Sequence, residues 1–258
     1  MRGSSRAPHA MEKLFEIVHE DAELLVLNKP ADLVCHPTKG DVYSSLISRI
    51  RLHLPAAVRP QLVNRLDRET SGIVLVAKTD VAARELRKIW ETRAVRKEYL
   101  AVVHGHVRSA VGMIEAPLGK DESSVVAIKD CVRADGAAAQ TGFQVAKRFR
   151  RAEGDFTLLR VQPLTGRKHQ IRIHLAHYGH PIVGDKLYGG DPDLYLALVQ
   201  NRLTPEQRQR LVLWCHALHA AEVHFAWRGQ DQVFRSAPEP WFTEFLNSAG
   251  QEKGHELG

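Results

Sequence analysis

Short strand-like runs dominate this 258-residue chain, and several of them alternate apolar and polar residues. Helical patterns are fewer, and the clearest covers residues 80–93, where Ala82, Leu86 and Ile89 are spaced four and three residues apart. Because strands and helices do not alternate regularly, the pattern predicts an α+β protein with a mixed, largely antiparallel sheet rather than a doubly wound parallel sheet. The predicted strands are residues 14–18, 24–27, 73–77, 99–103, 141–145, 156–161 and 218–225, and the other predicted helices are residues 42–52, about 168–178, 193–200, 205–212 and 240–247.

The chain length fits one large domain or two joined halves, and no linker or internal repeat divides it. Small and polar residues fill positions 1–12, which we expect to form a loose arm, and positions 249–258 are expected to be a frayed tail. A single domain is therefore predicted over residues 13–248.

Composition argues against several classes of protein. No apolar stretch approaches the roughly 18 residues of a membrane-spanning helix, and the first ten residues lack the apolar segment of a signal peptide, so we expect a cytoplasmic protein. The 3 cysteines form no Cys-x-x-Cys pair and the 14 histidines match no compact zinc pattern, so neither disulfides nor a metal site is expected. The net charge of +6 is compatible with an anionic partner but does not establish one.

The densest group of reactive side chains lies between Asn64 and Gly72, directly before the apolar run 73–77. A loop at the entrance of a strand can hold Asp67 and its neighbours rigidly, as binding and catalytic sites require. Taken alone, the segment is explained more simply by a solvated turn in which Asp67 accepts backbone hydrogen bonds.

The segment from Asn64 to Gly72 resembles the His-Arg-Leu-Asp-x-x-Thr-Ser-Gly signature of the RluA-like family of RNA pseudouridine synthases. Residues 97–105 resemble the Lys-x-Tyr-x-Ala segment of that family, and residues 166–175 resemble its Gly-Arg-x-His-Gln-Ile/Leu-Arg-x-His block. These blocks follow the order of the family and, with smaller similarities, cover roughly residues 24–225. The smaller similarities are residues 28–30 with 36–37, 180–185 with 187–189, and 218–220.

The resemblance implies a pseudouridine synthase-like catalytic domain, with two sheet-containing halves flanked by helices around a basic cleft and Asp67 at its floor. It implies an isomerase that converts uridine in ribosomal or transfer RNA to pseudouridine. The reaction breaks the N1–C1′ bond, turns the base and rejoins it through C5, so no redox cofactor, group donor or metal is expected. The implied partner is structured RNA, and nothing demands a protein partner or more than a monomer.

Asn64 departs from the family pattern, which has histidine at this position. Because Asp67, Arg65 and the Thr-Ser-Gly run are retained, we expect a change in substrate fit or loop geometry rather than in the chemistry. A catalytically inactive RNA-binding or RNA-folding module of the same fold is the alternative. A hydrolase that uses Asp67 as its nucleophile is more distant, since it leaves Tyr99 and residues 166–175 unexplained.

The resemblance places the nucleophile or charge-stabilising group on Asp67. A carboxylate in a pocket dry enough for a base needs a nearby cation or several donated hydrogen bonds to stay ionised, and Arg172 is the family-matched candidate. In a helix that starts at Lys168, residues 168 and 172 share one stripe beside an apolar stripe that contains Ile171. The same spacing fits a pair of surface cations that contact solvent or phosphate.

Tyr99 is where the resemblance places an aromatic ring against the target base and a possible proton acceptor. Since an ordinary phenol has a pKa of about 10, the second role needs help from the surroundings. Ile171 is expected to pack beside the base. Ordinary core packing accounts for both side chains as well.

Arg65 is expected to contact RNA that opens around an extruded uridine, because a base in structured RNA must leave its stack before it can react. An ion pair with Glu69 or Asp67 explains this arginine equally well. Other substrate contacts are expected at Asn64, Thr70, Arg167, Lys168 and His169. Two basic groups are predicted to bind phosphate unless they are merely solvated: Arg84, Arg87, Lys88, Arg93, Arg96 and Lys97, and then Lys147, Arg148, Arg150 and Arg151.

Overall fold

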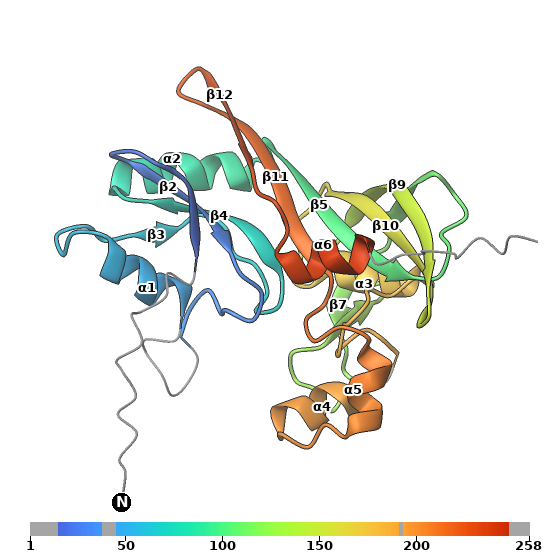
Figure 1. The fold of residues 1–258 in the computed structure, drawn as a ribbon. Helices are drawn as coiled ribbons and strands as arrows, with labels where there is room; N and C mark the ends of the chain where they lie inside the picture. The colour runs from blue at the N-terminus through green and yellow to red at the C-terminus, as the bar shows by residue number, and fades with distance from the viewer. Residues whose placement is uncertain (1–14, 38–44, 191–192, 248–258) are drawn as a thin grey trace, which may run out of the picture.

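The computed structural model describes residues 15–37, 45–190 and 193–247. Predictions on the remaining positions, including the loose arm and the frayed tail, lie outside the described residues. The described chain forms a ten-stranded sheet, a two-stranded sheet and helices on their faces (Figure 1). The strands are β1 (Glu16–Glu20), β2 (Leu24–Lys29), β3 (Gln61–Leu62), β4 (Ser71–Ala77), β5 (Val95–His104), β6 (Val111–Glu115), β7 (Leu118–Lys120), β8 (Asp130–Val132), β9 (Gln140–Arg151), β10 (Gly154–Pro163), β11 (Leu218–Trp227) and β12 (Gln230–Arg235). The helices are α1 (Leu46–His53), α2 (Asp80–Glu91), α3 (Gln170–His177), α4 (Asp193–Val199), α5 (Pro205–Leu211) and α6 (Pro240–Asn247).

The large sheet has the strand order β1-β2-β4-β11-β5-β10-β9-β6, with β12 paired to β11 and β3 paired to β4. Among the described strand pairs, β4 and β11 run parallel and the others run antiparallel. The prediction of an α+β protein with a mixed, largely antiparallel sheet is therefore confirmed. The two expected halves share this one continuous sheet.

Helices cover both faces of the sheet at β2 and β4, which explains why every residue of β4 is buried. Successive strand residues point to opposite faces. On one face Leu25 packs in a cluster with Leu46 of α1, and on the other Leu24 packs in a cluster with Leu86 of α2. The segment that precedes β4 is thus attached to a rigid support.

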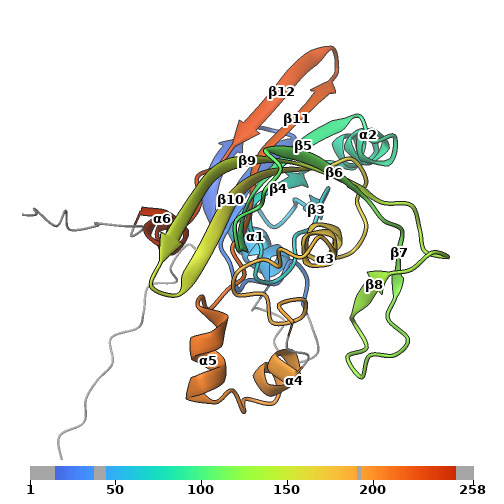
Figure 2. The ribbon, with the colours of Figure 1, turned by 90° about the vertical axis from the view of Figure 1, so that its right-hand side faces the viewer.

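The other half of the sheet packs against α3 and α6. Phe156 of β10, Ile171 of α3 and Phe242 of α6 belong to one buried cluster. Helices α4 and α5 lie beyond α3, away from the large sheet (Figure 2). None of the helices in the described ranges is long and apolar enough to span a membrane.

Gly72 allows β4 and β11 to approach each other closely where they begin to pair. Its φ is +112°, a conformation that side chains disfavour, and a Cβ atom there would lie 2.3 Å from the carbonyl oxygen of Ala220. The glycine of the signature segment is therefore required by backbone geometry, not by chemistry.

The helix predicted near residue 168 begins later than expected, at Gln170. His169 precedes it with a φ of 54°, and Lys168 turns outward to an ion pair with Asp130 at 2.9 Å. The predicted stripe of Lys168 and Arg172 was therefore wrong, because only Arg172 lies on the helix. The helix is also buried on all sides from Gln170 to Leu175, so its residues do not divide into a packed face and an exposed face.

Candidate active site

The segment before β4 is pinned by two polar side chains. The amide of Asn64 donates to the carbonyl of Ile73 at 3.1 Å and accepts from the backbone N–H of Leu75 at 2.8 Å. Lys29, which is fully buried, donates to the carbonyls of Leu33 at 2.9 Å and Arg68 at 3.0 Å. Asn64 therefore supports the loop geometry, while the expected change in substrate fit or loop geometry relative to histidine stays a prediction.

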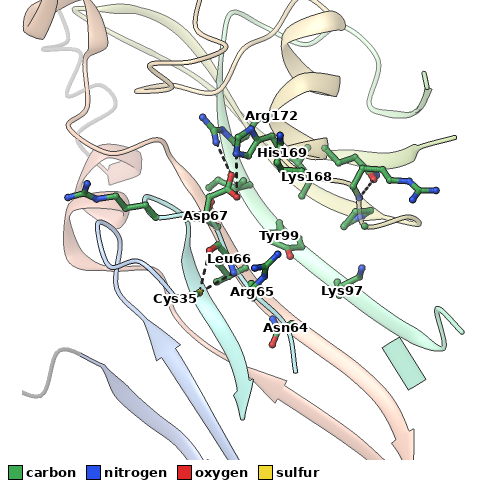
Figure 3. Close-up of a pocket in the computed structure, with 18 of the residues that line it drawn as sticks. Cys35, Asn64, Arg65, Leu66, Asp67, Lys97, Tyr99, Lys168, His169 and Arg172 are labelled. Atoms are coloured by element: carbon green, nitrogen blue, oxygen red, sulfur yellow. Dashed lines mark hydrogen bonds and ion pairs between the residues drawn. The ribbon is translucent and has the colours of Figure 1, made fainter. Parts of the chain in front are cut away.

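Arg172 links Asp67 to a second, deeper carboxylate. Its Nη1 donates to Oδ2 of Asp67 at 2.8 Å, while Nε and Nη2 donate to the two carboxylate oxygens of Asp185 at 2.7 and 2.8 Å (Figure 3). The side chain of Arg172 is 9% exposed and that of Asp185 is 0% exposed, whereas that of Asp67 is 30% exposed. The guanidinium is thus anchored on its inner side by Asp185 and donates to Asp67 through Nη1.

The protonation states follow from this arrangement. Burial alone would raise the pKa of Asp67, but the charge and hydrogen bond of Arg172, together with the neighbouring His169 and His216, outweigh burial and hold that pKa below its ordinary value. The pKa of Asp185 is lowered too, because the charge and hydrogen bonds of Arg172, with smaller contributions, outweigh the effect of burial. Asp67 is therefore a carboxylate at neutral pH, and its Oδ1 accepts no hydrogen bond from a described residue.

His169 lies on the other side of Asp67. Its Nε2 is 3.8 Å from Oδ1 of Asp67, and its Nδ1 is 2.9 Å from the hydroxyl of Tyr188. Burial lowers the pKa of His169 although the charge of Asp67 acts in the opposite direction, so this imidazole is neutral near pH 7. The ring of Tyr188 also packs against the guanidinium of Arg172, with 5.0 Å between the guanidinium carbon and the ring centre. Tyr188 therefore supports both neighbours of Asp67.

A polar network behind the loop accounts for Thr70 and Glu69. The hydroxyl of Thr70 is 2.7 Å from Nε2 of His216, and both residues are buried. Glu69 accepts from the ammonium group of Lys186 at 2.9 Å and from the backbone N–H of His216 at 3.2 Å. Burial lowers the pKa of His216 to about 3, so the ring is neutral. Thr70 therefore braces the loop from inside. Because it also lines the cavity beside Asp67, its expected contact with the substrate stays a prediction.

A cavity of about 540 Å³ opens beside Asp67 and is lined by Tyr99 and Ile171. Tyr99 is half-buried, packs against two core clusters, and makes no hydrogen bond through its hydroxyl to a described residue. Burial and the charge of Asp67 raise the pKa of Tyr99 to about 12. The surroundings thus keep the phenol protonated in the free protein, while its ring stays beside Asp67 (Figure 3).

Arg65 is exposed, lines the same cavity and forms no ion pair with any residue of the described ranges. The expected alternative, in which it pairs with Glu69 or Asp67, was wrong because Lys186 and Arg172 occupy those carboxylates. Other cations around the cavity are Arg68, Lys97, Arg167 and Lys168.

The two basic groups predicted from the sequence lie largely elsewhere. Of the first group, only Lys97 lines the cavity, and its pKa is lowered by burial. Arg93 and Arg96 are exposed outside it. In the second group, Arg151 packs over the ring of Phe245 at 4.4 Å, so this end of β9 supports α6. The structure does not bring the second group to the cavity.

Four residues to which the sequence assigned no role hold the predicted site residues and their loop in place. They are Asp185, Lys186, Tyr188 and His216. Asp185 and Tyr188 do fall in the short family-like segments at residues 180–185 and 187–189. In the described ranges, no three His, Cys, Asp or Glu side chains gather so that they could hold a metal ion.

Comparison with known proteins agrees with this geometry. The family model described as RNA pseudouridylate synthase matches residues 23–177. An uncharacterised RNA pseudouridine synthase of Bacillus subtilis is 38% identical over 193 residues, which cover 70% of this chain and 62% of the relative. The ribosomal large subunit pseudouridine synthase D of Pseudomonas aeruginosa is 40% identical over 180 residues, which cover 68% of this chain and 53% of the relative. The chain spans about half to two thirds of the length of such relatives.

Two solved human structures share the fold. Human RNA pseudouridylate synthase domain containing 4 matches with a TM-score of 0.68 and 25% identity, over 90% of this chain and 92% of its own. Human RNA pseudouridylate synthase domain containing 1 matches with a TM-score of 0.72 and 24% identity, over 93% of this chain and 89% of its own. The resemblance to the RluA-like family is thereby confirmed. By its family model, its relatives and the arrangement around Asp67, the chain belongs to the RNA pseudouridylate synthase family.

Proposed function

We propose that this protein is an RNA pseudouridine synthase that isomerises uridine in structured ribosomal or transfer RNA, with no cofactor. The observation that carries the proposal is the carboxylate of Asp67, which Arg172 holds ionised at 2.8 Å beside a cavity that also contains Tyr99. A charged carboxylate next to an aromatic ring is the arrangement that a uridine C1′ and its base require.

The geometry assigns different tasks to the two oxygens of Asp67. Oδ2 is engaged by Arg172, whereas Oδ1 is available to react. As the N1–C1′ bond breaks, Oδ1 bonds to C1′ or stabilises its positive charge, and the electron pair of the bond leaves with the base. The base then turns, and C5 bonds to C1′ as the bond from C1′ to Oδ1, where one has formed, breaks and returns its electron pair to the carboxylate. C5 loses its proton and N1 gains one, so the reaction is a net isomerisation. Attack on the base, and elimination at the sugar, are alternative routes that use the same carboxylate.

Tyr99 supplies the stacking surface for the base, and its hydroxyl is our candidate for the group that moves the C5 proton. The charge of Asp67 contributes to the high pKa of this phenol. When Asp67 bonds to the substrate, that charge disappears, and one cause of the high pKa disappears with it.

The rim of the cavity supplies the contacts for RNA. Arg65, Lys97, Arg167 and Lys168 are among its cations, while Asp67 is the acidic residue among its described lining residues. This local excess of positive charge supports the basic cleft that the resemblance implies. Phosphate contacts of this kind make binding fall with salt, by roughly 0.7 to 0.9 in logarithmic slope for each contact.

The test uses total RNA labelled with 5-tritiated uridine from cells that lack the gene. The purified protein should release tritium from this RNA, and Asp67→Asn should lower the rate roughly 10³-fold or more. Asp135→Asn, which removes an exposed carboxylate that lines neither cavity, should leave the rate near the wild-type value. Pseudouridine mapping of total RNA with and without the protein then identifies the site.

The rival proposal, a catalytically inactive RNA-binding or RNA-folding module, predicts RNA binding without tritium release. The ion pair between Asp67 and Arg172 counts against it, because a module that only binds RNA has no need of a buried arginine facing a carboxylate. That the protein is monomeric and cytoplasmic stays a prediction, which size-exclusion chromatography and cell fractionation check.

A further inference from the structure

A second cavity adjoins the first at Asp67. It measures about 550 Å³, and both cavities are lined by Asp67, Arg68, His169 and Arg172. The first cavity extends from these residues toward Tyr99. The second extends the other way, toward the segment of α4 and α5. A strand of RNA with its target base in the first cavity can therefore continue directly into the second.

Trp214 is the aromatic residue of the second cavity that is most exposed, with 52% of its surface accessible. The guanidinium carbon of Arg208 lies 5.0 Å from the centre of its ring, and the ammonium nitrogen of Lys186 lies 5.7 Å from it. Lys186 is occupied by Glu69 and by the backbone carbonyl of Trp214, so it fixes the backbone at this tryptophan. The exposed indole lies in the second cavity with two cations beside its ring.

The lining of this cavity combines the features that bind a nucleotide. Leu198 and Leu203 supply an apolar wall, and the indole of Trp214 supplies a ring face. Arg208 supplies positive charge, whereas Arg68 is paired with Asp32 of the same lining at 2.7 Å. Bases splayed out of RNA stack on aromatic rings, while arginines contact the adjoining phosphates or stack on the bases themselves.

We propose that the second cavity binds the base of a nucleotide next to the target uridine, stacked on Trp214, with Arg208 at its phosphate. This inference rests on the proposed function and adds a binding site to it. Extruding one nucleotide disturbs its neighbours, and a second site that stacks the neighbouring base recovers part of the cost of opening the RNA. The helices α4 and α5 thus take part in substrate selection.

The first experiment compares substitutions at Trp214 in the tritium-release assay on labelled total RNA from cells that lack the gene. Trp214→Leu keeps an apolar side chain but removes the ring, and it should raise KM about ten-fold or more with a smaller change in kcat. Trp214→Phe keeps a ring and should stay within about three-fold of wild type. The matched control is Trp227→Leu, at the end of β11 and outside both cavities, which should leave KM unchanged.

A wild-type KM for Trp214→Leu in a variant with an unchanged melting temperature would overturn the inference and leave the proposed function intact. The absence of tritium release by the wild-type protein would instead reject the proposed function. The two failures are therefore distinguishable.

The second experiment does not depend on turnover. Replacing Trp90, Trp227 and Trp241 by phenylalanine leaves Trp214 as the single tryptophan of the chain. Titration with the same total RNA should quench its fluorescence, because a stacked base quenches an indole. Adding Arg208→Ala should weaken this binding and reduce its dependence on salt. Binding that leaves the fluorescence of Trp214 unchanged would contradict the proposed stacking, whether or not the enzyme is active.

Discussion

The carboxylate of Asp185 accepts two hydrogen bonds from the guanidinium of Arg172, at 2.7 and 2.8 Å, and so fixes the orientation of its Nη1. Nη1 donates to Asp67 at 2.8 Å. Backbone N–H groups of Leu187 and Tyr188 donate to Asp185 in turn, at 2.9 and 3.0 Å. Asp185 is thus a positioning residue that acts on Asp67 through Arg172, in the same way that a buried acid orients a catalytic base elsewhere.

Asp185→Asn should disable this positioning. An amide accepts one of the two hydrogen bonds at most, so Arg172 tilts and loses an anionic partner in the interior. We expect about 3–5 kcal/mol less stability, as for other broken buried pairs. We expect kcat to fall about 10²-fold, as for a small misplacement of a reacting group. Denaturant unfolding and tritium release measure the two effects.

The pH profile separates positioning from general destabilisation. With Arg172 displaced, the pKa of Asp67 should rise toward its ordinary value, so the acid limb of kcat/KM should move to higher pH. The control Asp135→Asn breaks an exposed ion pair with Arg133, outside both cavities, and should leave stability near the wild-type value without moving the limb. An unmoved acid limb in Asp185→Asn would show that the residue is only structural.

Tyr99→Phe and Tyr99→Leu should separate the ring from the hydroxyl. Phenylalanine keeps the stacking surface, so KM should stay near the wild-type value, while loss of a proton-transferring group should lower kcat by about 10²–10⁴-fold. Leucine removes the ring as well and should also raise KM. Steady-state kinetics of tritium release check both values, and equal kcat for wild type and Tyr99→Phe would exclude the hydroxyl from proton transfer.

Arg65→Ala should weaken the binding of structured RNA. Arg65 is exposed at the first cavity and forms no ion pair within the described part of the chain, so its removal breaks no internal contact of that kind. We expect a higher KM and a salt dependence of binding that is shallower by about 0.7 to 0.9. The matched control is Arg235→Ala on β12, an arginine that pairs with Glu222 and lines neither cavity. If both variants bind RNA as the wild type does, Arg65 has no part in recognition.

His216→Asn should make stability less sensitive to acid. Burial lowers the pKa of His216 to about 3, whereas an unfolded histidine has a pKa of about 6.5. Between these values the unfolded chain binds the extra proton, so the contribution of this residue is complete above pH 6.5 and is lost as the pH falls toward 3. The variant should reduce the slope of unfolding free energy against pH by up to about 1.4 kcal/mol per pH unit. Denaturant unfolding at a series of pH values measures the slope, and equal slopes for the two proteins would contradict the prediction.

Much of the fold was predictable from local patterns. The run at residues 73–77 became the fully buried strand β4, and the periodic segment at 80–93 became α2, because a continuous apolar run and a 3.6-residue period each suit a single kind of element. The strands β3, β6, β7, β8 and β12 were missed. They pair with partners that the local sequence does not reveal, and three of them have only two or three residues.

The helix around Arg172 shows where local patterns failed. Its predicted division into a polar and an apolar stripe assumed that one face meets water. In the structure the residues from Gln170 to Leu175 are all buried, and Arg172 is accommodated only because Asp67 and Asp185 neutralise it. Amphipathic spacing carries no information about an ion pair in the interior.

The sequence alone predicted the kind of sheet and the loop that bears Asp67. Through the family-like blocks it also associated Asp67 with Tyr99 and Arg172. Only the tertiary structure decided that Asp185 orients Arg172, that Thr70 faces the interior, and that a second cavity meets the first at Asp67. The reason is physical: Asp67 and Arg172 are 105 residues apart. Hydrogen-bond direction and burial between such distant side chains depend on how the sheet and α3 pack, and residue types and their spacing do not specify that packing.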